Sequence, residues 1–274
     1  MDQASAGNRP LTGQVAIVTG STQGIGAGIA LKLGAHGAEV LVHGRESQRA
    51  GGEKIVRAIT EAGSRAALVT GDVRDEAHCR DIVRKALELF GRVDILVNNA
   101  GVVHRGTIED TSRELYDEIL ETNLRAPFLI SQEAVRAMKE RRSGCIINIG
   151  SVNAHCGLKK VLAYSAAKGG LMTFTINLAN YLTKYRIRVN QINPGWVLTE
   201  GEHYVQSVVE GKGENWLEDA LKTRPYGRLL RPADIANAAL FFATNELISG
   251  AVIDYEQLPF NAPVELESPG AILT

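Results

Sequence analysis

The stretch that most constrains the fold runs from residue 15 to about residue 35 and joins an apolar segment to a helix through a glycine-rich turn. Residues 15–18 are all apolar, as in a strand buried on both faces. Glycines follow at positions 20, 24 and 26, and apolar residues then recur at helical spacing. A helix that begins at such a turn offers free N–H groups and a positive dipole end, which suit a pyrophosphate. A plain glycine turn is the alternative interpretation.

The same alternation of strand and helix continues along nearly the whole chain. It predicts one doubly wound α/β domain over residues 11–254, with a mostly seven-stranded parallel sheet and helices on both faces. Residues 1–10 are predicted to be a flexible arm, 196–224 a substrate lid and 255–274 a C-terminal tail. Strands are predicted at 15–18, 39–43, 66–73, 94–97, 145–149, 188–193 and 249–254, and helices at 25–35, 47–62, 75–90, 111–140, 163–184 and 232–243.

Composition and charge argue against several classes of protein. Hydrophobic residues make up 45% of the chain and charged residues 22%, and the net charge of −1 disfavours a nucleic-acid or anionic-membrane partner. No apolar run approaches the roughly 18 residues of a membrane span, and the first ten residues lack the apolar core of a secretion signal. The three cysteines show no CxxC spacing, which suits reduced thiols in a cytoplasm, and the six histidines show no metal-ligand spacing.

Tyr164 and Lys168 are the first candidates for chemistry. They lie four residues apart and therefore share a face of the predicted helix. An ammonium beside a phenol lowers the phenol pKa from about 10 toward the range that a general acid/base needs. Ser151 ends a predicted central strand, where ligands bind in parallel sheets. Chance supplies the Tyr/Lys spacing in about one chain of this composition in four. An ordinary amphipathic helix is therefore the alternative.

Two further positions bear on a dinucleotide ligand. Arg45 follows the second strand, where an acidic residue would accept the ribose 2′-OH. Its guanidinium suits a 2′-phosphate, which favours NADP(H) over NAD(H), although a solvated loop charge is the alternative. In the helix predicted to open with a Thr111-x-x-Glu114 capping box, Pro127 removes a hydrogen bond and is expected to loosen the preceding turn. The backbone carbonyl of Asn123 lies in that turn and is expected to bind a water.

Five motifs, taken in order, resemble those of the short-chain dehydrogenase/reductase family, whose members have a Rossmann fold and use NAD(P)(H). The match covers about residues 11–254. The motifs are Thr19-Gly20-x-x-x-Gly24-x-Gly26, Asp72, Asn98-Asn99-Ala100-Gly101, Ser151 with Tyr164-x-x-x-Lys168, and Pro194-Gly195.

The resemblance implies a role for each residue of a catalytic set. Tyr164 would exchange a proton with the substrate oxygen, and Ser151 would hold that oxygen. Lys168 would lower the Tyr164 pKa and bind the nicotinamide ribose, while Asn123 would hold a water. The implied cofactor contacts are Gly20, Ser21, Thr22, Gln23, Gly24, Ile25, Gly26, Arg45, Asp72, Val73, Asn99, Ala100, Gly101, Tyr164, Lys168, Pro194, Gly195, Val197 and Thr199. Within this set Asp72 would bind the adenine and Asn99 the adjacent ribose.

The chain departs from the family pattern at two places. Many NADP-using relatives have a basic residue at the position of Gln23, so the NADP(H) preference rests on Arg45. After the last strand the family has Asp-Gly-Gly, whereas here Asp254 is followed by 255-Tyr-Glu-Gln-257. The C-terminal wall of the substrate pocket is therefore expected to be unusual.

The expected function is reversible hydride transfer between NADP(H) and a secondary alcohol or ketone. Polar groups around the lid favour a small sugar, polyol or hydroxy acid, although each of them taken singly is more often structural. The candidate substrate residues are Ser151, Asn153, His155, Tyr164, Trp196, His203 and Tyr204, with Trp216 beside them.

Two other functions remain open at this point. The runner-up is a 3-oxoacyl-acyl-carrier-protein reductase, and the third is a non-catalytic NADP-binding regulator. For the runner-up, an acidic carrier would dock on Arg141, Arg142, Lys184 and Arg186. The family resemblance also implies a homodimer or homotetramer paired through residues 112–140 and 163–184.

Overall fold

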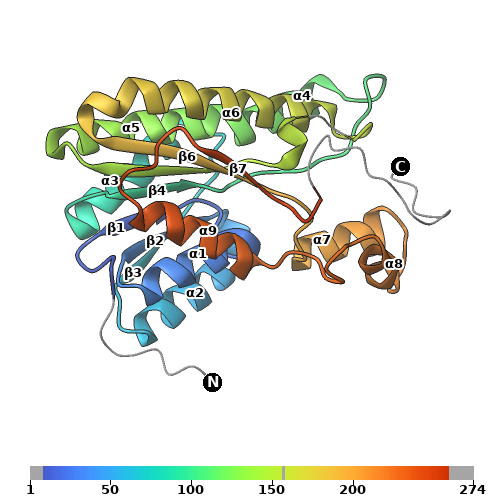
Figure 1. The fold of residues 1–274 in the computed structure, drawn as a ribbon, viewed down its shortest axis with the longest axis horizontal. Helices are drawn as coiled ribbons and strands as arrows, with labels where there is room; N and C mark the ends of the chain where they lie inside the picture. The colour runs from blue at the N-terminus through green and yellow to red at the C-terminus, as the bar shows by residue number, and fades with distance from the viewer. Residues whose placement is uncertain (1–8, 156–157, 259–274) are drawn as a thin grey trace.

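The computed structural model describes residues 9–155 and 158–258 (Figure 1). Its described strands form one sheet in the order β3-β2-β1-β4-β5-β6-β7, and every neighbouring pair is parallel. The predicted doubly wound fold is confirmed. The strands are β1 Val15–Val18, β2 Glu39–Gly44, β3 Ala66–Thr70, β4 Ile95–Asn98, β5 Gly144–Ile149, β6 Ile187–Pro194 and β7 Val252–Tyr255.

Helices cover both faces of the sheet. Figure 1 shows α5 and α6 on one face and α1, α2 and α9 on the other. Alternate side chains of each strand enter the two cores: Ala16 and Val18 pack with α1 and α9, and Ile17 packs with α3 and α5. The helices are α1 Gly24–Ala35, α2 Arg49–Glu61, α3 Glu76–Phe90, α4 Arg113–Leu120, α5 Ala126–Arg141, α6 Leu162–Leu182, α7 Glu200–Tyr204, α8 Trp216–Lys222 and α9 Pro232–Thr244.

Three predicted boundaries are corrected. The third strand ends at Thr70, so Asp72 lies in the following turn, where its carboxylate bonds the backbone of residue 74. The capping residue of α4 is Ser112, whose Oγ accepts from the Leu115 N–H at 3.1 Å, and not Thr111. The last strand begins at Val252, later than expected, because Gly250 has a φ of +81° and turns the chain.

The long helix predicted over 111–140 is interrupted where Pro127 was expected to loosen it. A π-helical turn spans Glu121–Arg125 and separates α4 from α5. Proline has no N–H to donate back to the preceding turn, which permits the wider spacing there. Asn123 lies inside this turn and is fully buried.

A row of polar side chains crosses three strands just below their carboxyl ends. Asn98 pairs in register with Asn148, and Asn148 with Gln191. The Asn98 amide donates to Asn148 Oδ1 at 2.8 Å, and the Asn148 amide donates to Thr175 Oγ1 at 2.8 Å. Thr175 belongs to α6, so these buried hydrogen bonds fix that helix against the sheet.

Candidate active site

Ser151 lies at the carboxyl end of β5, beside the end of β6. Its backbone N–H donates to Asn193 Oδ1 at 3.1 Å, which ties the two strand ends together. Its Oγ accepts from the Asn153 N–H at 3.2 Å, and the residue is 6% exposed. The serine hydroxyl is therefore held at the edge of the sheet where parallel strands present ligands.

Tyr164 and Lys168 occupy the first two turns of α6 and face this edge. Both are buried, with 7% and 4% of their surface exposed. The Lys168 ammonium donates to the Ile149 carbonyl at 2.8 Å and lies 5.6 Å from the Tyr164 ring centroid. The Tyr164 hydroxyl shares a hydrogen bond with the Ser151 side chain. The structure thus brings together three of the four residues of the predicted catalytic set.

The pKa of Tyr164 corrects one expectation. Burial raises it from its ordinary 10.0 to about 12, the hydrogen bond with Ser151 opposes this rise, and the charge of Glu202 adds to it. Burial also lowers the pKa of Lys168 to about 8. Lys168 was expected to lower the pKa of the Tyr164 phenol. In the protein without a ligand this pKa is raised instead, because desolvation of the phenolate outweighs the other effects.

Asn123 approaches the same group from the π-helical turn. Its amide donates to the carbonyls of Val102 and Ile119, both at 2.9 Å. Its side-chain Oδ1 is buried and has no hydrogen-bond partner in the described chain. A Cβ at Gly101 would lie 2.7 Å from this oxygen and 3.7 Å from Lys168 Nζ. This side-chain oxygen is thus an unused acceptor beside Lys168, and the predicted water on the backbone carbonyl of Asn123 stays a prediction.

The glycine turn between β1 and α1 has the conformation of a phosphate cradle. Gly20 and Gly24 have φ values of +62° and +56°, which favour glycine. A Cβ at Gly26 would overlap the Gly20 carbonyl and the Asn99 amide. The Asn99 amide donates to the carbonyls of Thr19 (2.8 Å) and Gly20 (3.0 Å), so this side chain braces the turn.

The two residues predicted to contact the adenosine end of the cofactor differ in their surroundings. Arg45 is exposed and precedes the short 3₁₀ turn Glu46–Gln48. Asp72 is engaged by its neighbour Arg74, whose guanidinium lies 2.7 Å from Asp72 Oδ2 and lowers the pKa of that carboxyl. An adenine that bound to Asp72 would therefore have to share its carboxylate with Arg74.

His43 is a residue of this region that the sequence reasoning missed. Its Nδ1 accepts from the Gly20 N–H at 3.3 Å, and its Nε2 lies 3.1 Å from Nε2 of His78. Burial, followed by the charge of His78, lowers its pKa to about 3, so the ring is neutral and supports the glycine turn. The sequence signal that could have identified His43 is its position at the end of an apolar strand segment.

Segment 195–199 continues from β6 into the lid, and several of its predicted cofactor contacts are used within the fold. The Gly195 N–H donates to the Tyr255 carbonyl at 3.0 Å, and Val197 bridges to Leu230. The Thr199 hydroxyl caps α7. Its methyl group lies 3.6 Å from the position of a Cβ on Gly24, so the lid begins against the glycine turn.

The predicted substrate residues separate into two groups. Asn153 and His155 follow Ser151, and His155 Nε2 lies 2.9 Å from Asp254 Oδ1. Trp196 packs against Trp216 with centroids 5.9 Å apart, and Trp216 Nε1 donates to His203 Nδ1 at 3.0 Å. This trio forms an aromatic cluster inside the lid. Tyr204 is 59% exposed.

A profile of the short chain dehydrogenases matches residues 14–209. The chain belongs to that family. A 2-dehydro-3-deoxy-D-gluconate 5-dehydrogenase of Formosa agariphila is 35% identical over 246 residues, which cover 88% of this chain and 90% of that protein. An oxidoreductase of Methylorubrum extorquens is 39% identical over 247 residues, with 89% and 96% covered. A solved actinorhodin polyketide ketoreductase with NADPH has a TM-score of 0.84 at 31% identity, over 89% of this chain and 96% of that one.

The enzyme is therefore an oxidoreductase of a family that binds a nicotinamide cofactor. Its residues fit such a cofactor. The glycine turn leaves no room for a Cβ at Gly26, and the first N–H groups of α1 lie beside it. The buried oxygen of Asn123 is unsatisfied close to Lys168. Among residues 9–155 and 158–258, no helix is both long and apolar enough to cross a bilayer.

Lys168 gives a test of these electrostatics. Its pKa is about 8 in the folded enzyme and 10.5 ordinarily. The unfolded chain therefore holds a proton that the folded enzyme has lost between pH 8 and 10.5, and stability from this group rises with pH across that window. Below pH 8 the buried charge costs about 3 kcal/mol, whereas the hydrogen bond to Ile149 returns about 1 kcal/mol. We expect Lys168→Met to stabilise the enzyme by about 2 kcal/mol at pH 7.

Thermal unfolding at pH 7 and pH 10 measures this effect. The advantage of the variant should shrink at the higher pH. Lys54→Met, at an exposed position of α2, is the control and should change stability little. A Lys168→Met variant that is less stable than the wild type at pH 7 would contradict the account.

Proposed function

We propose that the enzyme transfers a hydride between NADP(H) and a secondary alcohol or ketone of a small polar substrate. The observation that carries this proposal is the buried contact of Ser151, Tyr164 and Lys168 at the carboxyl ends of the central strands. A buried phenol beside an ammonium has one evident use here, which is to pass a proton to or from a substrate oxygen.

The side chains divide the proton chemistry among them. With a pKa of about 12, Tyr164 is protonated at neutral pH and donates its proton to a carbonyl oxygen during reduction. Ser151 orients that oxygen through its hydroxyl. Lys168 stabilises the phenolate that remains, and a water on Asn123 Oδ1 would return the proton. The bound nicotinamide supplies the hydride, or accepts it in the opposite direction.

The surroundings of Arg45 support NADP(H) as the cofactor. The last residue of β2 is Gly44, where a Cβ would overlap Thr22, so no acidic side chain stands against a 2′-phosphate there. The nearest following acid is Glu46. Its carboxylate is bound by Arg49 at 2.6 Å and by the Thr70 hydroxyl at 2.6 Å, which leaves Arg45 to interact with a phosphate.

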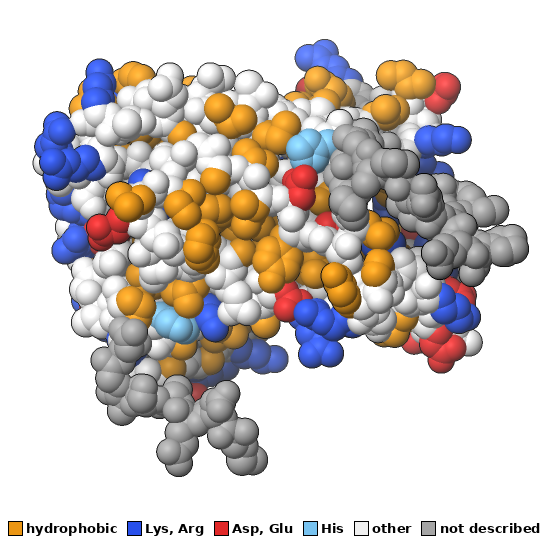
Figure 2. All heavy atoms as spheres, viewed as in Figure 1, with side chains coloured by type: hydrophobic (Ala, Val, Ile, Leu, Met, Phe, Trp, Pro, Cys, Tyr) orange, Lys and Arg blue, Asp and Glu red, His pale blue; other side chains and the backbone are white. Residues whose placement is uncertain are grey.

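The positions of the basic residues weaken the carrier-protein alternative. Arg141, Arg142, Lys184 and Arg186 lie at the C-terminal ends of α5 and α6, where Figure 2 shows Lys and Arg gathered at the left edge. In a parallel α/β fold these helix ends lie at the amino edge of the sheet, opposite Ser151 and Tyr164. An acidic carrier bound there would be remote from the proposed site.

Replacement of Tyr164 tests the proposed chemistry. We expect Tyr164→Phe to lower kcat by about 10²- to 10⁴-fold, because it removes the proton donor. Its affinity for NADPH, measured by titration, should stay within about twofold of the wild type. The assay follows NADPH absorbance with a panel of ketoses, polyols, hydroxy acids and 3-oxo thioesters. A variant that keeps wild-type turnover of any substrate in the panel would refute the proposed role.

Replacement of Arg45 tests the cofactor preference. A charge-assisted hydrogen bond to phosphate contributes about 1.5–3 kcal/mol, so Arg45→Ala should weaken NADP(H) binding by about 10- to 100-fold. Binding of NAD(H) should hardly change. Arg57→Ala, at an exposed position of α2, is the matched control. Equal losses for both cofactors, or tighter binding of NAD(H) by the wild type, would show that Arg45 does not read the phosphate.

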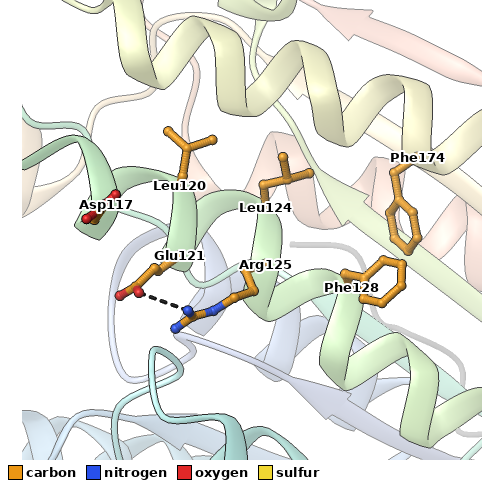
Figure 3. Close-up of a pocket in the computed structure, with 7 residues that line it drawn as sticks. All are labelled: Asp117, Leu120, Glu121, Leu124, Arg125, Phe128 and Phe174. Carbon is orange, nitrogen blue, oxygen red and sulfur yellow. Dashed lines mark ion pairs between the residues drawn. The ribbon is translucent and has the colours of Figure 1, made fainter. Parts of the chain in front are cut away.

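An apolar groove on α4, α5 and α6 supports the proposal of a homodimer or homotetramer. The groove measures about 520 Å³ and is shown in Figure 3. Phe128 and Phe174 meet in its lining with centroids 5.4 Å apart, and Phe128 is 49% exposed. An exposed apolar face of this kind is typical of a subunit contact. The lining residues are Asp117, Leu120, Glu121, Leu124, Arg125, Phe128 and Phe174.

Light scattering with size exclusion tests this contact. We expect the wild type to be at least dimeric, and Phe128→Glu to give monomers because it would bury a charge against a second subunit. Leu89→Glu, a similarly exposed apolar position on α3, is the control and should leave the mass unchanged. A monomeric wild type, or a Phe128→Glu variant that stays associated, would remove the proposed interface.

A further inference from the structure

Glu202 lies in the first turn of the lid, next to the proposed cofactor site. Its backbone N–H donates to the Thr199 hydroxyl at 3.0 Å. Thr199 in turn lies against Gly24 of the glycine turn, with its methyl group 3.6 Å from the position of a Cβ there. Glu202 therefore sits on α7, whose capping residue Thr199 lies against the glycine turn.

The carboxylate of Glu202 is held in one orientation by two N–H donors. Its Oε1 accepts from Trp196 Nε1 and from Gln206 Nε2, each at 2.7 Å. Trp196 follows Pro194 and Gly195 at the end of β6, and Gln206 is 5% exposed. Across the described residues, no donor is recorded for the second oxygen, Oε2, which leaves it available to a ligand.

This carboxylate has no cation of its own, whereas three other carboxylates around the site are paired. No described Lys, Arg or His forms an ion pair with Glu202. Lys212 approaches only through the Gln206 amide, donating to its Oε1 at 2.8 Å. Lys159 and Lys160 are exposed on the turn before α6, where solvent screens their charges. The paired groups are Arg105 with Glu210 (3.1 Å), Arg224 with Glu256 (3.6 Å) and His155 with Asp254 (2.9 Å).

The negative charge of Glu202 is felt at the proposed reacting group. It contributes to the raised pKa of Tyr164, which requires the carboxylate to lie within electrostatic range of the phenol. The carboxylate is half-buried and has no cationic partner among the described residues, so it can accept a hydrogen bond from a ligand group that reaches Tyr164.

We propose that Glu202 selects the substrate: its carboxylate accepts a hydrogen bond from a substrate hydroxyl and repels a substrate carboxylate. The enzyme would then act on neutral polyols and sugars in preference to hydroxy acids. This inference rests on the proposed function and narrows its substrate class. It sets this enzyme apart from its relative named for 2-dehydro-3-deoxy-D-gluconate, which is a sugar acid.

The expected size of the effect follows from the two interactions. A hydroxyl that donates to a carboxylate gains about 1.5–3 kcal/mol, which corresponds to about 10- to 100-fold in affinity. Two carboxylates a few ångströms apart in a partly buried site repel each other, which weakens binding of the acid further. A neutral substrate should therefore bind at least about tenfold more tightly than the acid of the same carbon chain.

Intrinsic fluorescence measures this difference without any turnover. The chain has two tryptophans, Trp196 and Trp216, and they stack on each other beside Glu202. The probes are glycerol and glycerate, xylitol and xylonate, and sorbitol and gluconate, each titrated in the presence of saturating NADPH, with which none of these alcohols can be oxidised. We expect the neutral member to bind at least about tenfold more tightly in every pair that gives a signal.

Two variants test whether Glu202 causes the preference for neutral ligands over acids. Glu202→Gln keeps an oxygen for Trp196 and removes the charge, so the preference should fall to within about threefold, with tighter binding of the acids. Glu200→Gln makes the same change at an exposed position of the same helix and should keep the wild-type preference. The same pairs are also assayed for turnover.

The outcomes separate the two proposals. Equal or tighter binding of the acids by the wild type, an unchanged preference in Glu202→Gln, or no signal from any pair would overturn the role of Glu202. Failure of Tyr164→Phe to reduce turnover would overturn the proposed reaction instead, whatever the fluorescence titrations give.

Discussion

The hydrogen bond from the Lys168 ammonium to the Ile149 carbonyl is the contact on which the proposed site depends. It joins the second turn of α6 to the end of β5, one turn from Tyr164 and two residues from Ser151. Because the ammonium is buried, holding it there opposes folding, and its pKa falls to about 8. The fold accepts this penalty at the place where chemistry needs a positive charge, as proteins commonly do at active sites.

The rest of the structure supplies the support that this contact requires. The aligned Asn98, Asn148 and Gln191 side chains run beneath the strand ends and reach α6 through Thr175. Asn99 and His43 brace the glycine turn from two sides, one through its carbonyls and the other through an N–H. Each of these side chains is buried or partly buried and makes at least one hydrogen bond, so together they hold the backbone of the site.

Much of this could be predicted from the sequence, because the signals were local. The alternation of apolar segments with helical patterns predicted a doubly wound parallel sheet. The four-residue spacing of Tyr164 and Lys168 predicted that both lie on one face of a helix. What could not be predicted depends on contacts between distant segments. The bracing role of Asn99 and the support from His43 arise only when separate segments meet. The direction of the Tyr164 pKa shift was missed for the same reason, since burial is a property of the whole fold.

The lid likewise combines features that could be predicted from the sequence with contacts that could not. Its length and aromatic content were visible in the sequence, yet Trp196, His203 and Trp216 prove to be packed on one another, and the unpaired charge beside them belongs to Glu202.

The central claim is that Tyr164 exchanges the proton, and the pH dependence of both reaction directions tests it most directly. The account predicts that alcohol oxidation rises with pH toward the Tyr164 pKa of about 12, that ketone reduction holds until that pKa is approached, and that the rise in oxidation is lost in Tyr164→Phe. Oxidation that is independent of pH below that pKa, or a rise of the same size in Tyr164→Phe, would contradict it.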